Sequence, residues 1–219
     1  MIVVIQCAAR KQPDAGRMVT GDGKPVEFIA DPEAAPDNES RLYARPDDPA
    51  FGAKSWRQLL MDFNKAPGNN PLGLYPAYKL YENGAYGRLV ERFGIPSVFI
   101  LSAGWGLIRA DFLTPYYDIT FSKNPKVPKF KRRNKSDRYD DFRMLPDDTQ
   151  EEIVFFGSLD YLLQFCKLTA GVRGKRIVFY NSVASPRVGD CALKRFETTT
   201  RTNWHYECVD AFLDGKITV

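Results

Sequence analysis

The chain has 219 residues, of which 44% are hydrophobic and 13% aromatic, and its formal net charge is +4. This supply of apolar residues is enough to bury the core of one α/β domain, so extensive disorder is excluded. No run of 18 apolar residues occurs, which excludes a membrane-spanning helix of ordinary length.

The cysteine and histidine content argues against a metal enzyme. The four cysteines form no CxxC pair and the chain has a single histidine, so we expect no protein-ligated zinc and no cofactor. Residues 1–5 are apolar at once, with no basic segment before them. We therefore expect no signal peptide, a cytoplasmic protein and reduced thiols.

Five segments are predicted to be strands. Four of them are continuous apolar runs, at residues 2–6, 97–102, 153–157 and 176–181. Continuous apolarity is typical of strands in a parallel sheet that is covered on both faces. The fifth segment, at about 203–209, alternates in polarity and predicts an edge strand.

Three helices are predicted between the strands. Residues 55–64 place apolar side chains at helical spacing after Ser55, which is a suitable N-cap. Residues 75–93 and 159–169 also show a helical pattern. Alternating strands and helices indicate an α/β fold, with a mostly parallel central sheet flanked by helices.

Two segments do not follow this alternation. Residues 13–54 form a long loop insertion with one short strand near 26–29, and residues 123–145 form a basic tract. Seven cations and no carboxylate lie within residues 123–135. We expect one α/β domain over residues 1–219, in which the tract is either a solvated loop or a polyanion-binding surface. Its candidate DNA-phosphate contacts are Lys126, Lys129, Lys131, Arg132, Arg133 and Lys135.

Three of the predicted strands end in small or polar residues. Ligands of open α/β sheets bind where the parallel strands end, so these residues are candidates for substrate binding. They are Cys7, Arg10 and Lys11 after the first strand, Ser102, Gly104 and Trp105 after the second, and Asn181 and Ser182 after the last. Cys7 is either a small buried residue or a nucleophile, and Arg10 and Lys11 are natural phosphate contacts. No GxxxxGK[ST] motif is present, so a P-loop nucleotidase is not supported.

Asp118 is the candidate catalytic carboxylate. It follows Tyr116 and Tyr117, whose rings could hold a base by stacking, and the basic tract begins soon after it. A carboxylate beside an aromatic platform suits cleavage of an N-glycosidic bond, because the transition state resembles an oxocarbenium ion. Asn181 is the candidate polar partner for the leaving base or the attacking water. Asp111 is a second carboxylate that could do the same work, and Asp118 could instead cap a turn.

Three short motifs resemble the YaaA-like superfamily. They are Cys7-Ala8-Ala9-Arg10-Lys11 after the first strand, LSAGWGL at 101–107 and PYYDIT at 115–120. The resemblance implies an α/β domain associated with DNA, although the motif here carries one extra tyrosine before Asp118. The overall appearance of the chain is also similar to bacterial antiphage DNA glycosylases of the Brig type, which remove glucosylated hydroxymethylcytosine from phage DNA.

The leading functional hypothesis is a metal-independent DNA glycosylase that acts on a modified base as antiphage defence. Its partner would be double-stranded DNA with the modified base flipped out, and no membrane or protein partner is expected. Water is the expected nucleophile, and Lys11 as a Schiff-base nucleophile is the mechanistic variant. The alternatives are a non-catalytic DNA-binding stress protein and an enzyme acting on free nucleotides or nucleosides.

Overall fold

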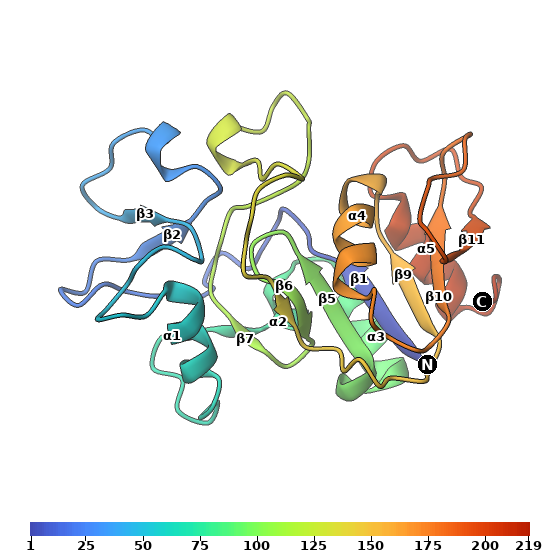
Figure 1. Ribbon diagram of the computed structural model, residues 1–219, viewed down its shortest axis with the longest axis horizontal. Coiled ribbons are helices and arrows are strands. Elements are labelled where there is room, and N and C mark those ends of the chain that lie inside the picture. Colours follow the sequence, from blue (N-terminus) through green and yellow to red (C-terminus); the bar gives the residue numbers. More distant parts are fainter.

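A seven-stranded sheet lies at the centre of the computed structural model, which describes residues 1–219 (Figure 1). The strand order is β11-β10-β9-β1-β5-β6-β8; the first five of these run parallel, β6 is antiparallel to β5, and β8 is parallel to β6. The bounds are β1 Ile2–Gln6, β5 Val98–Ser102, β6 Gly106–Arg109, β8 Phe142–Arg143, β9 Ile153–Phe156, β10 Arg176–Tyr180 and β11 Ala192–Arg195. The predicted α/β class, with a mostly parallel sheet flanked by helices, is therefore confirmed.

Helices cover both faces of this sheet. On β9, Phe155 stacks on Phe165 of α4 (Leu159–Leu168), with ring centroids 4.5 Å apart, while Phe156 contacts Phe212 of α5 (Trp204–Leu213) at 5.3 Å. Adjacent strand residues point to opposite faces, so α4 and α5 lie on opposite sides of the sheet. Helix α3 (Ala85–Phe93) packs beside α5 on the same face (Figure 1). Strands β1, β5, β9 and β10 are buried along their whole length, which explains their continuous apolar sequences.

The insertion and the basic tract pack against each other beside β6 and β8 (Figure 1). The insertion contains the parallel pair β2 (Val26–Phe28) and β3 (Leu42–Ala44), the short helix η1 (Pro32–Ala34) and helix α1 (Trp56–Phe63). The tract contains the short helix η3 (Lys129–Lys131). The backbone N–H groups of Ala30 and Asp31 both donate to the carbonyl oxygen of Phe130, and Thr120 bridges to Arg132. The predicted Ser55 cap is present as a capping box with Gln58.

Two predicted elements differ from the structure. Residues 203–209 belong to α5 and not to an edge strand, because Trp204, His205, Cys208 and Val209 form one buried helical face; the edge strand is β11. The single helix predicted over 75–93 is divided into β4 (Tyr75–Pro76), α2 (Ala77–Leu80) and α3. Tyr81 leaves the helix because its backbone bridges to Lys11.

The remaining elements are short. β4 pairs antiparallel with β7 (Leu113–Thr114), and η2 (Ile95–Ser97) leads into β5. None of the helices combines the length and the apolarity that crossing a lipid bilayer requires.

Candidate functional site

The carboxyl ends of the parallel strands meet on the side of the sheet where the tract and the insertion lie (Figure 1). From β1 the chain continues to β5 on one side, while β9 and β10 lie on the other side, with α3 and α4 on opposite faces. The strand order therefore reverses at β1 and β9, and open α/β sheets bind ligands at such a reversal. Across it, the backbone N–H of Ser158 donates to Oε1 of Gln6 at 2.6 Å, and Sγ of Cys7 lies 3.2 Å from the Tyr161 hydroxyl.

Lys11 is a buried cation with no ion-pair partner. Its Nζ lies 4.2 Å from the centre of the Tyr117 ring, with the Tyr116 and Tyr81 rings at 5.7 and 5.9 Å. The carbonyl oxygens of Ala8 and Ala9 accept its hydrogen bonds at 3.3 and 3.4 Å. Burial lowers the pKa of Lys11, although Cys7 and Asp118 lie close enough to oppose this shift.

The other buried charged side chains all have partners of opposite charge. Arg57 pairs with Asp47, Arg133 with Asp141, Arg176 with Asp190, and Glu27 with Arg41. An ammonium group without a counter-ion is costly to bury, and perturbed lysines of this kind are found at functional sites. Lys11 therefore sets this edge of the sheet apart from the rest of the interior.

A network of hydroxyl groups connects Lys11 to the end of β5. The Tyr117 hydroxyl shares a hydrogen bond of 2.8 Å with the Tyr81 hydroxyl and accepts one of 2.8 Å from Oγ of Ser102. Ser102 in turn accepts from the backbone N–H groups of Gly104 and Trp105. Burial raises the pKa of Tyr117 and Tyr81 well above the usual range, so both remain protonated hydrogen-bonding groups.

Asp118 lies on the same side of the sheet and is partly exposed. Its carboxylate accepts a hydrogen bond of 2.5 Å from Nζ of Lys131, and the two side chains are 26% and 24% exposed. Although burial opposes it, this ion pair raises the pKa of Lys131. Asp111 instead follows the antiparallel strand β6, where Ala110 bonds to Val98 at the start of β5. Asp111 therefore lies at the opposite edge of the sheet, paired with Arg109 on the surface.

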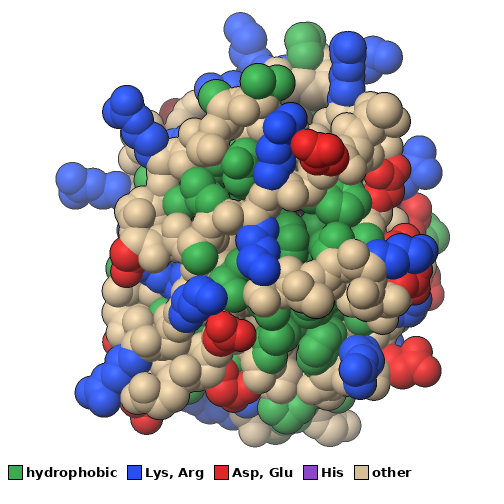
Figure 2. All heavy atoms as spheres, turned by 90° about the vertical axis from the view of Figure 1, so that its right-hand side faces the viewer, with side chains coloured by type: hydrophobic (Ala, Val, Ile, Leu, Met, Phe, Trp, Pro, Cys, Tyr) green, Lys and Arg blue, Asp and Glu red, His purple; other side chains and the backbone are tan.

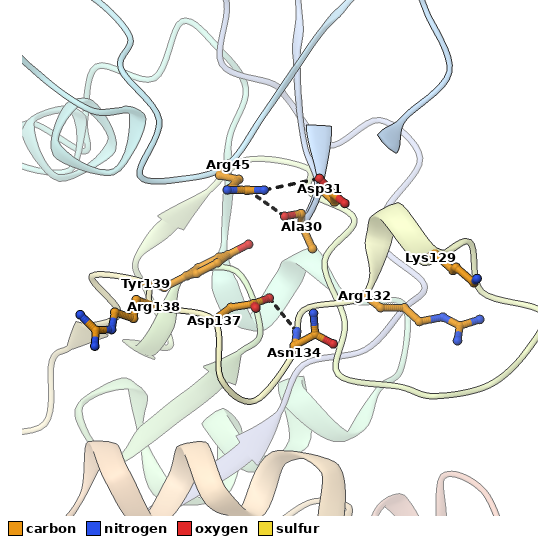
Figure 3. A pocket seen from close by; sticks show the side chains of 9 residues that line it. All are labelled: Ala30, Asp31, Arg45, Lys129, Arg132, Asn134, Asp137, Arg138 and Tyr139. Carbon is orange, nitrogen blue, oxygen red and sulfur yellow. Dashed lines mark hydrogen bonds and ion pairs between the residues drawn. The ribbon is translucent and has the colours of Figure 1, made fainter. Parts of the chain in front are cut away.

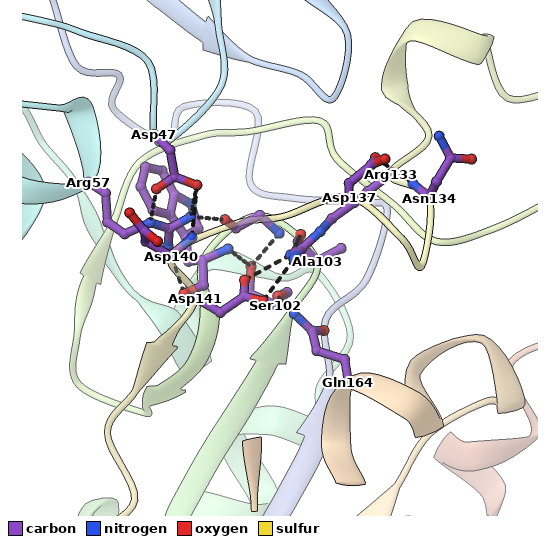
Figure 4. Close-up of polar contacts among 12 residues, drawn as sticks. Asp47, Arg57, Ser102, Ala103, Arg133, Asn134, Asp137, Asp140, Asp141 and Gln164 are labelled. Atoms are coloured by element: carbon purple, nitrogen blue, oxygen red, sulfur yellow. Dashed lines mark hydrogen bonds and ion pairs between the residues drawn. The ribbon is translucent and has the colours of Figure 1, made fainter. Parts of the chain in front are cut away.

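Two buried arginines hold the loop that follows β5. Arg57 donates to the carbonyl oxygens of Gly104 and Trp105, both at 3.0 Å, and Arg133 donates to that of Ala103 at 2.8 Å (Figure 4). At Gly106 the backbone φ is +91°, and a Cβ there would lie 2.5 Å from the carbonyl oxygen of Phe142. The loop is thus a fixed part of the sheet edge.

The predicted aromatic platform is packed inside the protein. Trp105 and Tyr117 have no exposed surface, and Trp105 contacts Phe28 and Phe142. The guanidinium of Arg17 covers the Tyr116 ring at 4.1 Å. The rings of Trp105 and Tyr117 thus support the site from within, and neither offers a free face to a base.

Asn181 and Ser182 follow β10 and bond to their own surroundings. Asn181 donates to the carbonyl oxygen of Thr200 at 3.4 Å, and Ser182 donates to that of Ala184 at 2.6 Å. β9 lies between β10 and β1 in the sheet, so the structure does not place either residue against Asp118. Arg10 is exposed near the end of β1.

The six candidate phosphate contacts divide into two groups. Lys126, Lys129 and Lys135 are exposed and have no ion pair. The other three are engaged within the protein: Lys131 with Asp118, Arg132 with carbonyl oxygens of residues 124–127, and Arg133 with Asp141.

A cavity of about 520 Å³ lies between the tract and the insertion (Figure 3). Four cations and two carboxylates line it together with Tyr139: Arg45, Lys129, Arg132, Arg138, Asp31 and Asp137. This excess of cations suits an anionic ligand. By contrast, the face in Figure 2, on the β11 side, shows cations interspersed with carboxylates and apolar side chains.

A second cavity of about 190 Å³ lies between the tract and α4. Sequence reasoning did not single out the residues that build this edge from a distance, among them Gln164, Arg57, Arg45, Tyr81 and Tyr161. No short motif marks them. The helical pattern predicted at 159–169 could only have shown that Gln164 lies on the same helix as the buried Phe165.

Comparison with known proteins adds no relative: no family model, no curated protein and no solved structure matches the chain.

Proposed function

We propose that the protein is a DNA glycosylase that cleaves the N-glycosidic bond of a modified base. The observation that carries this proposal is the pairing of Lys11 and Asp118 at one sheet edge: a buried ammonium without a counter-ion, and a partly exposed carboxylate close enough to influence its pKa. Base release requires charge of both signs, because the sugar becomes cationic while the leaving base gains electrons.

Each charged group has a role in this reaction. The carboxylate of Asp118, oriented by Lys131, would stabilise the oxocarbenium-like sugar or direct a water molecule at its anomeric carbon. Lys11 lies below it, and its lowered pKa makes a neutral amine easier to reach than for an exposed lysine. In the Schiff-base variant this amine attacks the anomeric carbon, the base departs with the bonding electrons, and the sugar opens to an imine.

The neighbouring surface supports DNA as the substrate. Lys126, Lys129 and Lys135 are exposed, and the cavity of Figure 3 adds Arg45 and Arg138. Flexible cations beside a strand-end site suit the flanking phosphates of a duplex from which one base is flipped. The resemblance to the YaaA-like superfamily and to Brig-type glycosylases adds glucosylated hydroxymethylcytosine in phage DNA as the first substrate to try.

The test compares base release from phage DNA containing glucosylated hydroxymethylcytosine with release from unmodified DNA. We expect abasic sites, counted with an aldehyde-reactive probe, only with the modified DNA. Asp118→Asn should lower the rate by roughly 10²- to 10³-fold, as expected for loss of one electrostatic contact to the transition state. Asp111→Asn is the matched control and should retain the wild-type rate.

Full activity in a folded Asp118→Asn variant would contradict the assignment of that carboxylate. Borohydride reduction separates the two mechanisms: a trapped protein–DNA adduct that is lost in Lys11→Arg favours the Schiff base, whereas base release without trapping favours water.

A non-catalytic DNA-binding protein is the second candidate, favoured by the three unpaired lysines of the tract. It predicts salt-dependent binding that Lys126→Ala and Lys129→Ala weaken, with no base released from any DNA. Turnover of free nucleosides, unaffected by these substitutions, would instead indicate an enzyme of nucleotide metabolism.

A further inference from the structure

The smaller cavity, of about 190 Å³, is bounded by the basic tract on one side and by α4 on the other. Phe121 and Leu163 supply apolar surface, and Leu163 is 55% exposed at the rim. Pockets for drug-sized molecules measure about 300–1,000 Å³, so this cavity suits a group of one or two rings and not a whole nucleotide.

Two buried polar atoms on the cavity wall have no partner within the protein. Nε2 of Gln164 donates to the carbonyl oxygen of Ser102 at 3.3 Å, which leaves the acceptor Oε1 unpaired. Arg133 uses its two terminal nitrogens for Asp141 and Ala103, which leaves the Nε–H donor unpaired. Both side chains are 6% exposed. Figure 4 shows Gln164 rising from α4 toward Ser102, with Arg133 and Asn134 beyond it.

Unpaired buried donors and acceptors are rare, and each one costs free energy unless a partner arrives. Here one wall provides an acceptor and another a donor, between apolar side chains. A planar ring that carries a donor next to an acceptor would satisfy both atoms at once. The pairing edge of every nucleobase has this arrangement.

The cavity is also connected to the strand-end site. Gln164 bonds to Ser102, which bonds to Tyr117, whose ring lies under the ammonium of Lys11. On the other side, Phe121 contacts the Tyr161 ring, whose hydroxyl lies 3.2 Å from Cys7. One layer of side chains therefore separates the cavity from Lys11 and Cys7.

We infer that this cavity is the nucleobase pocket of the protein, in which Gln164 Oε1 accepts a hydrogen bond from the base and Arg133 Nε donates one to it. The inference rests on the proposed function for the source of the base, namely DNA. A free nucleoside offers the same chemistry, and the experiment distinguishes the two sources.

The experiment measures binding in two arms. One arm titrates free deoxynucleosides and follows their NMR signals; the other titrates an oligonucleotide with a single 2-aminopurine and follows its fluorescence. Leu163→Trp fills the rim of the pocket from an exposed position, so it should fold normally and abolish binding of the base. Leu159→Trp, on the same helix but outside the cavity, is the matched control and should bind as wild type.

Gln164→Leu tests the hydrogen bond itself and should weaken binding of the base about 3- to 10-fold, the effect of losing one such bond. An effect of both variants in the DNA arm alone supports a flipped base as the ligand, and an effect in both arms supports free nucleosides as well. The inference is overturned if wild type binds neither probe, or if Leu163→Trp and Gln164→Leu bind both as well as wild type.

The outcome for the proposed function can be read separately. If modified DNA loses its base equally with wild type and Leu163→Trp, the glycosylase proposal stands and the pocket is elsewhere. If both binding arms show the pocket and no DNA loses a base, the pocket stands and the glycosylase proposal fails.

Discussion

The guanidinium of Arg133 binds the carboxylate of Asp141 through two parallel hydrogen bonds of 2.8 Å, with both side chains at least 96% buried. The same arginine holds the carbonyl oxygen of Ala103 after β5 and covers the Tyr139 ring at 3.8 Å. A cation from the basic tract is thus part of the structural core of the sheet edge.

Asp141→Asn should destabilise the protein strongly, because it leaves the guanidinium of Arg133 buried with no counter-ion. We expect the free energy of unfolding to fall by about 3 to 5 kcal/mol, measured by urea denaturation. The exposed pair Arg109–Asp111 gives the comparison, since Asp111→Asn should change stability by no more than about 1 kcal/mol. Similar effects of the two substitutions would show that the buried pair is not needed for stability.

Two glycines should respond to alanine in opposite directions. Gly106→Ala forces a Cβ against the backbone of Phe142 at a φ of +91°, so it should destabilise by more than about 1 kcal/mol. Gly87 lies on the exposed side of α3 with open space around it, and Gly87→Ala should stabilise by about 0.4 to 1 kcal/mol. Thermal unfolding of both variants checks the contrast, which would fail if Gly106→Ala melted as wild type does.

Removing the buried charge at Lys11 should make the protein more stable and less functional. Lys11→Met keeps the length of the side chain and removes an ammonium that has no counter-ion, so the free energy of unfolding should rise on the order of 1 kcal/mol. Lys126→Met, at an exposed position, should change stability by less than about 0.5 kcal/mol. A marked loss of stability in Lys11→Met would mean that the charge itself holds the fold together.

His205 should make stability depend on pH below neutrality. It is 1% exposed, neither ring nitrogen has a partner, and burial lowers its pKa to about 4. Between the unfolded pKa of about 6.5 and that value, the unfolded chain binds a proton that the native state does not. Stability therefore falls as pH falls through this window, by roughly 3 kcal/mol in total.

The measurement for His205 is urea unfolding at about pH 7 and about pH 4.5, in wild type and in His205→Phe. The variant lacks this contribution, so its loss of stability on acidification should be smaller. Equal losses in the two proteins would assign the pH dependence to other groups.

The sequence was informative where one segment alone determines the outcome. Continuous apolar runs predicted β1, β5, β9 and β10, because strands buried on both faces need apolar side chains at every position. The same alternation of polarity can suit a strand or a short helix, and residues 203–209 were predicted wrongly for that reason.

The candidate site shows the same division. The strand-end rule brought Cys7, Lys11 and Ser102 together, since the carboxyl ends of parallel strands share one edge. It could not reveal that Arg133 of a charged tract is buried, because its partners Asp141 and Ala103 meet it only through tertiary pairing. Nor could it indicate the open hydrogen-bonding atom of Gln164, which depends on how α4 lies against β5.

The three carbonyl oxygens after β5 also bear on how the chain reaches its native state. Those of Gly104 and Trp105 are held by Arg57 and that of Ala103 by Arg133, which lie 47, 48 and 30 residues away. Contacts between distant segments form only after the entropy of closing long loops has been overcome, and they slow folding. We therefore expect the candidate site to be the last region to become ordered during folding, after the central parallel strands have assembled.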